Sequence, residues 1–268
     1  FIAVCVEKEL TEECANKMLQ KFEFFSGYGF NKSHAVSYSA LSYQCAWLFN
    51  YYPVEWMAAF LDKEPETRKE KAINLAKKFK FKIQSIDINK SGVVWEIAED
   101  NKTLIQPLTS LKGLGSKAME QIIDNRPFNV IEDFLFSEDI IYSKLNKKAL
   151  DVLARSEALN CLIDDRFAGT KHFWTAAVVE RPKNKKKLEE NIELYKPEGE
   201  FSNRERIENL VSLTGIFPMD LVMDETILKR LEEYQVPPLG NWDNDLGVAW
   251  FIPREVIEKK TKNGKPYW

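Results

Sequence analysis

Histidine, closely spaced cysteines and excess charge of one sign are all scarce in this sequence. The 268 residues include 2 histidines and 4 cysteines, and the formal net charge is −3. Because the net charge is small and negative, we expect no basic surface over the whole chain. Any site for phosphates must therefore be local. No two cysteines have the spacing of metal ligands, which favours reduced thiols over a zinc site or a disulfide framework. Of the histidines, His172 stands alone among aromatic residues, and we expect a structural side chain there rather than a ligand.

Apolar runs of membrane length and a signal peptide are also missing. The composition, 44% hydrophobic and 29% charged, is typical of globular protein. We therefore expect a cytoplasmic protein with no membrane partner. The sequence starts at Phe1 and stops within "TKNGKPYW", so we expect a segment of a longer polypeptide.

Helical periodicity dominates the first eighty residues. A helix is expected over 7–26, with Thr11 suited to its start. A second is expected over 35–50, capped by Asn31 or Ser33. Its apolar residues lie on every side, so other elements should enclose it and its aromatic residues should be mostly core. Two further helices are expected, from Pro53 to Leu61 and over 66–80.

The rest of the chain predicts a small β element and more helices, so the predicted fold class is mainly α with a small β element (α+β). Residues 81–108 alternate like strands, with a turn at "AEDNKT". Short helices are expected over 109–165. The stretch 166–240 reads as helical, interrupted by a polar loop over 181–203. From Leu246 onward we expect a strand and then a hairpin turn at Asn263-Gly264.

The stretch 111–123, "LKGLGSKAMEQII", is the clearest chemical motif. Gly113 and Gly115 separate a short helix from an amphipathic one, and glycine permits a turn with positive φ. The first amides of the second helix lack intrahelical partners, so with the helix dipole and flanking lysines they would suit a phosphate oxygen. This pattern resembles a helix-hairpin-helix, which grips DNA by its backbone. A plain αα-hairpin with a glycine turn explains the same pattern.

A second hairpin without Gly-x-Gly is expected where "SKLN" precedes "KKALDVLARSEAL". Its lysines, Lys144, Lys147 and Lys148, have the charge needed to touch a phosphate. A degenerate structural twin that completes the domain is the competing interpretation.

A third polar cluster, "GYGFNKSHA" at 27–35, lies at the start of the expected helix over 35–50. Lysine, serine and free amides together suit a triphosphate or a backbone phosphate. The residues themselves equally allow a simple helix cap with a structural His34.

The segment 27–61 closely resembles the fingers of bacterial family C replicative DNA polymerases, the DNA polymerase III alpha subunit. The shared features are "FNKSHA", a Tyr-Gln pair, a Tyr-Pro and "VEWMAAFL". Downstream, "IQSIDINKS" is similar to the family's strand element. The stretch from "LTSLKGLGSKAMEQII" to Arg126, Phe128, Asp133 and Phe134 is similar to its tandem helix-hairpin-helix. "VIEKKTKNGKPYW" is similar to the opening of its OB-fold domain.

The resemblance implies five regions in one order. They are the C-terminal part of the fingers (1–65), a helix with a small strand unit (66–108), a tandem helix-hairpin-helix (109–165), a helical connector (166–243) and the start of an OB fold (244–268).

It also implies two binding sites, for the partners dNTP and primer-template DNA. The nucleotide-binding residues would be Asn31, Lys32, Ser33 and His34. The DNA-binding residues would be Lys112, Gly113, Leu114, Gly115, Ser116, Lys117, Lys147 and Lys148. Lys260, Lys262 and Lys265 would point toward single-stranded template.

The resemblance implies a DNA-directed DNA polymerase as the parent enzyme, with two-metal chemistry on palm carboxylates. No paired-Asp motif occurs in 1–26, so we expect no catalytic residue, no bound cofactor and no activity in this segment alone, and Mg²⁺ in the palm of the parent. No Gln-and-aromatic clamp motif appears in 166–240, which leaves sliding-clamp binding in doubt; other replisome subunits remain candidate partners. The alternatives are a non-catalytic helix-hairpin-helix subunit or repair module, and a structural adaptor whose glycine turns only pack helices.

Overall fold

The computed structural model describes the chain except residues 29–31, 142, 224, 243–246, 254–256, 263–264 and 268. It divides into two compact units, Phe1–Thr109 and Ser110–Trp268, and each is described by itself. The predicted fold class, mainly α with a small β element, is confirmed.

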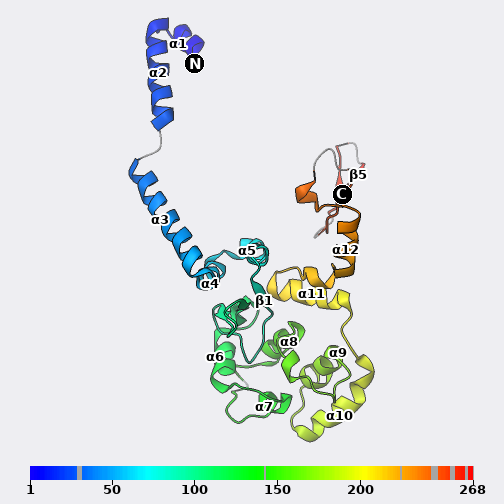
Figure 1. Cartoon of the computed structure of the whole chain (residues 1–268). Coiled ribbons are helices and arrows are strands. Elements are labelled where there is room, and N and C mark those ends of the chain that lie inside the picture. Colours follow the sequence, from blue (N-terminus) through cyan, green and yellow to red (C-terminus); the bar gives the residue numbers. More distant parts are fainter. Residues whose placement is uncertain are drawn as a thin grey trace. The chain divides into compact units, whose positions relative to one another are not determined.

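The described residues of the first unit begin with five helices. Figure 1 draws them in blue to cyan. They are α1 (Ile2–Glu7), α2 (Glu12–Tyr28), α3 (Lys32–Tyr51), α4 (Pro53–Lys63) and α5 (Glu66–Lys78). The hydroxyl of Thr11 accepts the N–H of Cys14 at 3.2 Å, so α2 begins after Thr11, where the sequence predicted a helix start. Pro53 fills the first turn of α4, where its missing N–H costs nothing.

Helix α3 differs from the expectation that other elements enclose it. None of its described side chains is buried, and Tyr43 is 70% exposed, so the prediction of a mostly core aromatic set is wrong here. The reason is that α3 packs chiefly on α4 alone, whereas α4 also packs on α5 and β2. The α3 aromatics contact one another instead, as in the pair Trp47–Tyr51.

The β element of the first unit is a three-stranded sheet with the order β1-β3-β2. Its strands are β1 (Lys82–Gln84), β2 (Glu96–Ile97) and β3 (Thr103–Ile105), with β1 parallel and β2 antiparallel to β3. The turn predicted at "AEDNKT" joins β2 to β3. There Asp100 accepts bonds from the Thr103 hydroxyl and from the N–H groups of Lys102 and Thr103, and these bonds lower the pKa of Asp100.

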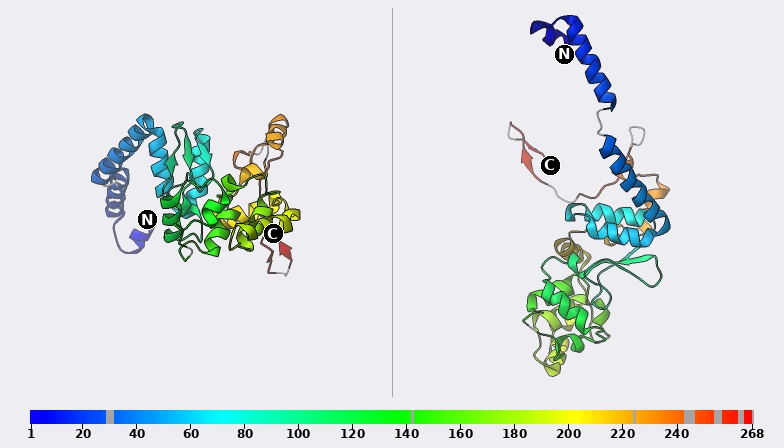
Figure 2. Two further views of the ribbon diagram at one scale, coloured as in Figure 1. Left: turned by 90° about the horizontal axis from the view of Figure 1, so that it is seen from below. Right: turned by 90° about the vertical axis from the view of Figure 1, so that its left-hand side faces the viewer.

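The described residues of the second unit form seven α-helices and shorter turns, and the 3₁₀ turn η1 (Leu108–Ser110) leads into them. Figure 2 shows helices α6 to α10, green to yellow, gathered in one body. The helices are α6 (Ser116–Asn125), α7 (Ile131–Leu135), α8 (Lys147–Arg155), α9 (Thr170–Phe173), α10 (Lys185–Tyr195), α11 (Asn203–Thr214) and α12 (Glu225–Glu233). The shorter turns are η2 (Asn160–Leu162), the π-helical η3 (Trp174–Val179), η4 (Lys196–Glu198), η5 (Met219–Leu221) and η6 (Leu239–Asn241).

The polar stretch 181–203, predicted as a loop, contains helix α10, so that prediction is wrong. Asn184 caps the helix by accepting the N–H of Lys187 at 2.9 Å, and Leu188 and Ile192 are buried. One buried stripe is enough to hold the helix against η3 although most of its residues are charged.

His172 is a core residue, in agreement with its structural interpretation. It is fully buried; its Nδ1 accepts the N–H of Ala168 at 2.8 Å, and its Nε2 lies 2.7 Å from the carbonyl of Ile192. Both ring nitrogens are therefore occupied within the protein.

In the C-terminal region the described residues form the strand pair of the predicted hairpin, and none of the described residues before it forms the predicted strand. Strands β4 (Lys259–Lys260) and β5 (Pro266–Tyr267) pair antiparallel, and the turn predicted at Asn263-Gly264 lies outside the described residues. Within 247–253, Trp250 makes only an isolated bridge to Pro238. None of the helices that the structure describes combines the length and hydrophobicity needed to cross a bilayer.

Candidate nucleic-acid interface

The beginnings of α6 and α8 open onto one hollow in the second unit. Its volume is about 340 Å³. The lining residues are Gly113, Gly115, Ser116, Lys117, Ala118, Lys144, Asn146, Lys148 and Ala149. Both predicted hairpins therefore contribute to a single surface, and three lysines belong to it.

The turn before α6 rests on α8. Gly113 has φ +93°, a conformation that favours glycine, and a Cβ built on it would lie 3.6 Å from Lys148 Cε and from Val152 Cγ2. The next residue, Leu114, is buried. Leu114 therefore anchors the turn from inside, and the glycines on either side of it stay at the surface.

Helix α6 begins without a side-chain cap. Gly115 is the N-cap, with extended backbone at φ −78° and ψ 155°, and its carbonyl accepts the N–H groups of Ala118 and Met119. Within the described chain, the N–H groups of Ser116 and Lys117 have no acceptor, and both residues are exposed. A Cβ on Gly115 would meet nothing within 4 Å, so this helix start is open to a ligand from outside.

Helix α8 begins with a cap that the sequence analysis missed. The side chain of Asn146 accepts the N–H of Ala149 at 3.0 Å, and Asn146 also lines the hollow. The signal was an Asn directly before an amphipathic helix. Lys144 and Lys148 line the hollow beside it, whereas Lys147 is exposed but is not part of the lining.

Lys112 is not part of this lining, although it belongs to the same turn. Its N–H donates to the carbonyl of Leu213 at 2.7 Å. Its ammonium lies 2.9 Å from the place that a Cβ on Gly215 would take, at the C-terminal end of α11. A cation is favoured there by the helix dipole.

The second set of predicted residues lies at the start of α3, in the first unit. Lys32, Ser33 and His34 are exposed in the first turn of that helix, and Asn31 lies outside the described residues. The carbonyl of Ser33 accepts the Ser37 hydroxyl at 2.8 Å. The ring of His34 lies 4.3 Å from that of Tyr38. The helix begins three residues earlier than predicted, which puts Ser33 inside the first turn rather than before it.

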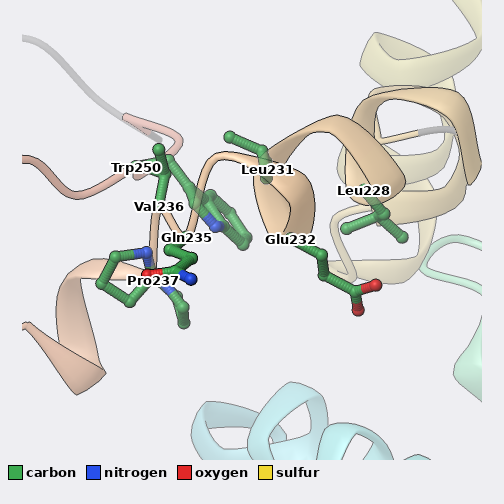
Figure 3. A pocket seen from close by; sticks show the side chains of 8 residues that line it. Leu228, Leu231, Glu232, Gln235, Val236, Pro237 and Trp250 are labelled. Carbon is green, nitrogen blue, oxygen red and sulfur yellow. The ribbon is translucent and has the colours of Figure 1, made fainter.

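A different hollow, of about 360 Å³, lies beside α12 and is mainly apolar in its residues. Figure 3 shows the indole of Trp250 directed toward Leu231, while Glu232 carries its carboxylate away from them. Among the described residues, no group of three or more potential metal ligands comes together in either unit.

The comparisons with known proteins agree with these features. A family model described as a helix-hairpin-helix motif matches residues 80–168. The chain is 29% identical to DNA polymerase III subunit alpha of Aquifex aeolicus over 274 residues, which covers 98% of this chain and 23% of that protein. It is 34% identical to the subunit of Thermus aquaticus over 172 residues, which covers 61% of this chain and 14% of that protein.

The subunit of Pseudomonas aeruginosa is 32% identical over 169 residues, 60% of this chain and 14% of that protein. The chain thus spans between 14% and 23% of the length of these relatives. The match to the Aquifex aeolicus protein runs through both units, and the family-model match includes both hairpins. The chain is therefore similar to the bacterial DNA polymerase III alpha subunits over nearly its whole length, and the resemblance predicted from the sequence is confirmed.

Proposed function

We propose that this chain is the fingers-to-hairpin part of a DNA-directed DNA polymerase, and that the hollow between α6 and α8 binds backbone phosphates of duplex DNA. The observation that carries the proposal is the convergence of two helix N-termini and three lysines on one hollow. A match that extends from the fingers segment through the hairpins favours a polymerase over an isolated helix-hairpin-helix module.

The chemistry of the hollow suits phosphate rather than bases. The open amides of Ser116 and Lys117 lie at the N-terminus of α6, which is the positive end of the helix dipole. The side chains of Lys117, Lys144 and Lys148 add positive charge to the same hollow. Such contacts fix a duplex in place without reading its sequence. Binding should therefore be nearly independent of sequence and should weaken steeply with salt.

Substitution of Gly115 separates DNA binding from folding. Gly115→Asp places a favourable capping carboxylate at the start of α6, where the backbone is extended and the space is open. We expect the melting temperature to stay equal or rise, while duplex affinity falls by at least tenfold because the carboxylate repels phosphate. Gly115→Asn, which adds a neutral cap of the same shape, should lose less affinity.

Fluorescence anisotropy with labelled duplexes of unrelated sequence measures these dissociation constants. Equal affinities for the Asp and Asn variants would reject the phosphate role of the α6 start.

We propose further that the start of α3 contacts the triphosphate of the incoming dNTP. Support comes from the exposure of Lys32 and Ser33 in the first turn of a 20-residue helix and from the fingers resemblance. In the complete polymerase, Lys32→Ala should raise the apparent KM for dNTPs. Lys21→Ala, an exposed lysine on α2, is the control. A normal KM in steady-state primer extension would leave the helix start with a capping role alone.

The residues described here do not fit a catalytic metal centre, because no cluster of potential ligands forms among them. We therefore derive no step of phosphoryl transfer from this chain. We propose that the Mg²⁺ ions of the parent enzyme are bound by other parts of the protein.

A further inference from the structure

Helix α11 contacts the DNA-binding hairpins at both of its ends, although it lies outside the 80–168 match to the helix-hairpin-helix model. Near its N-terminus, Arg206 donates from Nε and Nη2 to Glu157 at 2.6 and 3.0 Å. Glu157 follows α8 and has φ +66°, an uncommon conformation for a residue with a side chain. At the other end, the carbonyl of Leu213 accepts the N–H of Lys112. One helix thus joins the end of the second hairpin to the turn of the first.

The turn of the first hairpin is held from two sides. Helix α8 supports Gly113 through Lys148 and Val152, whose side chains meet the space above its Cα. Helix α11 holds the preceding residue through the Lys112–Leu213 backbone bond and through the seat of the Lys112 ammonium at Gly215. Gly215 has φ +72° and ends α11, where the helix dipole favours a cation.

We propose that α11 is a brace that positions the 112–115 turn for duplex DNA, and that Lys112 acts through α11 rather than by contact with a phosphate. This inference rests on the proposed function of the hollow. It assigns to Lys112, which lies next to the hollow, a role other than phosphate contact. Lys112 is a positioning residue, whereas Lys117 and Lys148 contact the DNA. Arg206 holds the opposite end of the brace.

The two roles differ in the salt dependence of binding. A lysine that neutralises a phosphate releases a counterion, so its loss lowers the slope of log K against log salt by about 0.9. A lysine that only holds the turn changes the affinity and leaves this slope unchanged. The slope is a readout that a structural role does not move.

The experiment measures duplex affinity of the full chain between 50 and about 200 mM salt, the range over which phosphate contacts change affinity most visibly. Lys112→Met removes the ammonium and keeps the aliphatic stem. We expect the duplex affinity to fall by about two- to fivefold, which corresponds to the interaction energy of one charge with a helix end. The slope of log K against log salt should stay unchanged. Arg206→Met should likewise lower the duplex affinity and leave the slope unchanged.

Arg204→Met is the matched control for Arg206, because Arg204 lies on the same helix and pairs only along it, with Glu208, among the described contacts. It should bind like the unchanged chain. Lys186→Met is the matched control for Lys112→Met, because Lys186 is an exposed lysine on α10. Circular dichroism and melting temperature identify any variant that fails to fold.

A slope reduced by about 0.9 in Lys112→Met would make Lys112 a phosphate contact and overturn the proposal. Unchanged affinity in both Lys112→Met and Arg206→Met would overturn it as well. Lys117→Ala in the same titration reports on the hollow separately. If Lys117→Ala keeps the full slope while Lys112→Met loses affinity, the phosphate site is wrong and the brace stands.

Discussion

At the scale of single residues, the two helix starts at the hollow are built differently. Asn146 occupies one amide of α8 with its side chain, whereas Gly115 gives α6 no side-chain cap. A capping side chain stabilises the fold but competes with an external anion for the same N–H groups. The glycine start is thus better suited to a phosphate, and the asparagine start contributes more to stability.

Asn146→Ala should destabilise the second unit. The variant leaves the N–H of Ala149 without its acceptor, and loss of such a cap costs about 1 kcal/mol. Urea unfolding followed by circular dichroism measures the change. Asn203→Ala, just inside the start of α11 where Ser202 is the cap, should be close to neutral. Equal stabilities for the two variants would contradict the capping role.

The residue types at the hollow were predictable in part. The Gly-x-Gly motif and its lysines were visible in the sequence, because short-range turn chemistry specifies them. The separation of Lys112 from Lys117 was not, because it depends on α11, a hundred residues downstream. The burial of Leu114, which gives it an anchoring position, was not predicted either, and its contact with DNA stays a prediction.

At the scale of secondary-structure elements, Arg166 connects the hairpin region to the connector. Its guanidinium pairs with Glu132 on α7 and Glu189 on α10, each at 2.7 Å, and with nearby Asp164. Hydrogen bonds from Arg166 hold the pKa values of Glu132 and Asp164 below their ordinary values of 4.5 and 3.8. A carboxylate with a lowered folded-state pKa stabilises the fold above its ordinary pKa, and this stabilisation disappears as the pH falls through the lowered value.

The free energy of unfolding of the second unit should therefore decrease as the pH falls below about 4.5. Arg166→Met should be less stable at pH 7. Its free energy of unfolding should decrease less steeply toward acid pH, because Glu132 and Asp164 then titrate closer to their ordinary pKa values. Denaturant unfolding at a series of pH values compares the two proteins. Parallel curves for both would show that Arg166 does not lower the pKa values of Glu132 and Asp164 in the folded protein.

Local sequence pattern predicted elements well where one face is buried. Helices α5 and α8 are examples, with Ala72, Ile73, Leu150 and Leu153 inside. The pattern failed for α10, which was predicted as a loop because most of its residues are charged and its buried stripe is narrow. It also failed for α3, because apolar residues on every side of a helix do not show whether other elements cover them. In both cases tertiary contacts decided the burial of the element, and local periodicity did not.

At the scale of the whole molecule, two units carry two different proposals. The first unit contains the start of α3, proposed for the dNTP, and the second contains the hollow, proposed for the duplex. The resemblance to the polymerase subunits was predictable from the sequence, and the match over 98% of the chain agrees with it. The order of regions that the resemblance implies stays a prediction. The predicted strand from Leu246 shows the limit of the pattern, because 247–253 form only an isolated bridge.

The central claim is that the hollow binds DNA phosphates, and the salt dependence of duplex binding tests it most directly. We expect log K for the full chain to fall linearly with log salt, and the slope of Lys117→Ala with Lys148→Ala to be smaller by about 1.8. Lys185→Ala with Lys186→Ala removes the same charge from α10 and should keep the full slope. If the hollow variant kept the full slope as well, the lysines at α6 and α8 would not be phosphate contacts, and the account would be wrong.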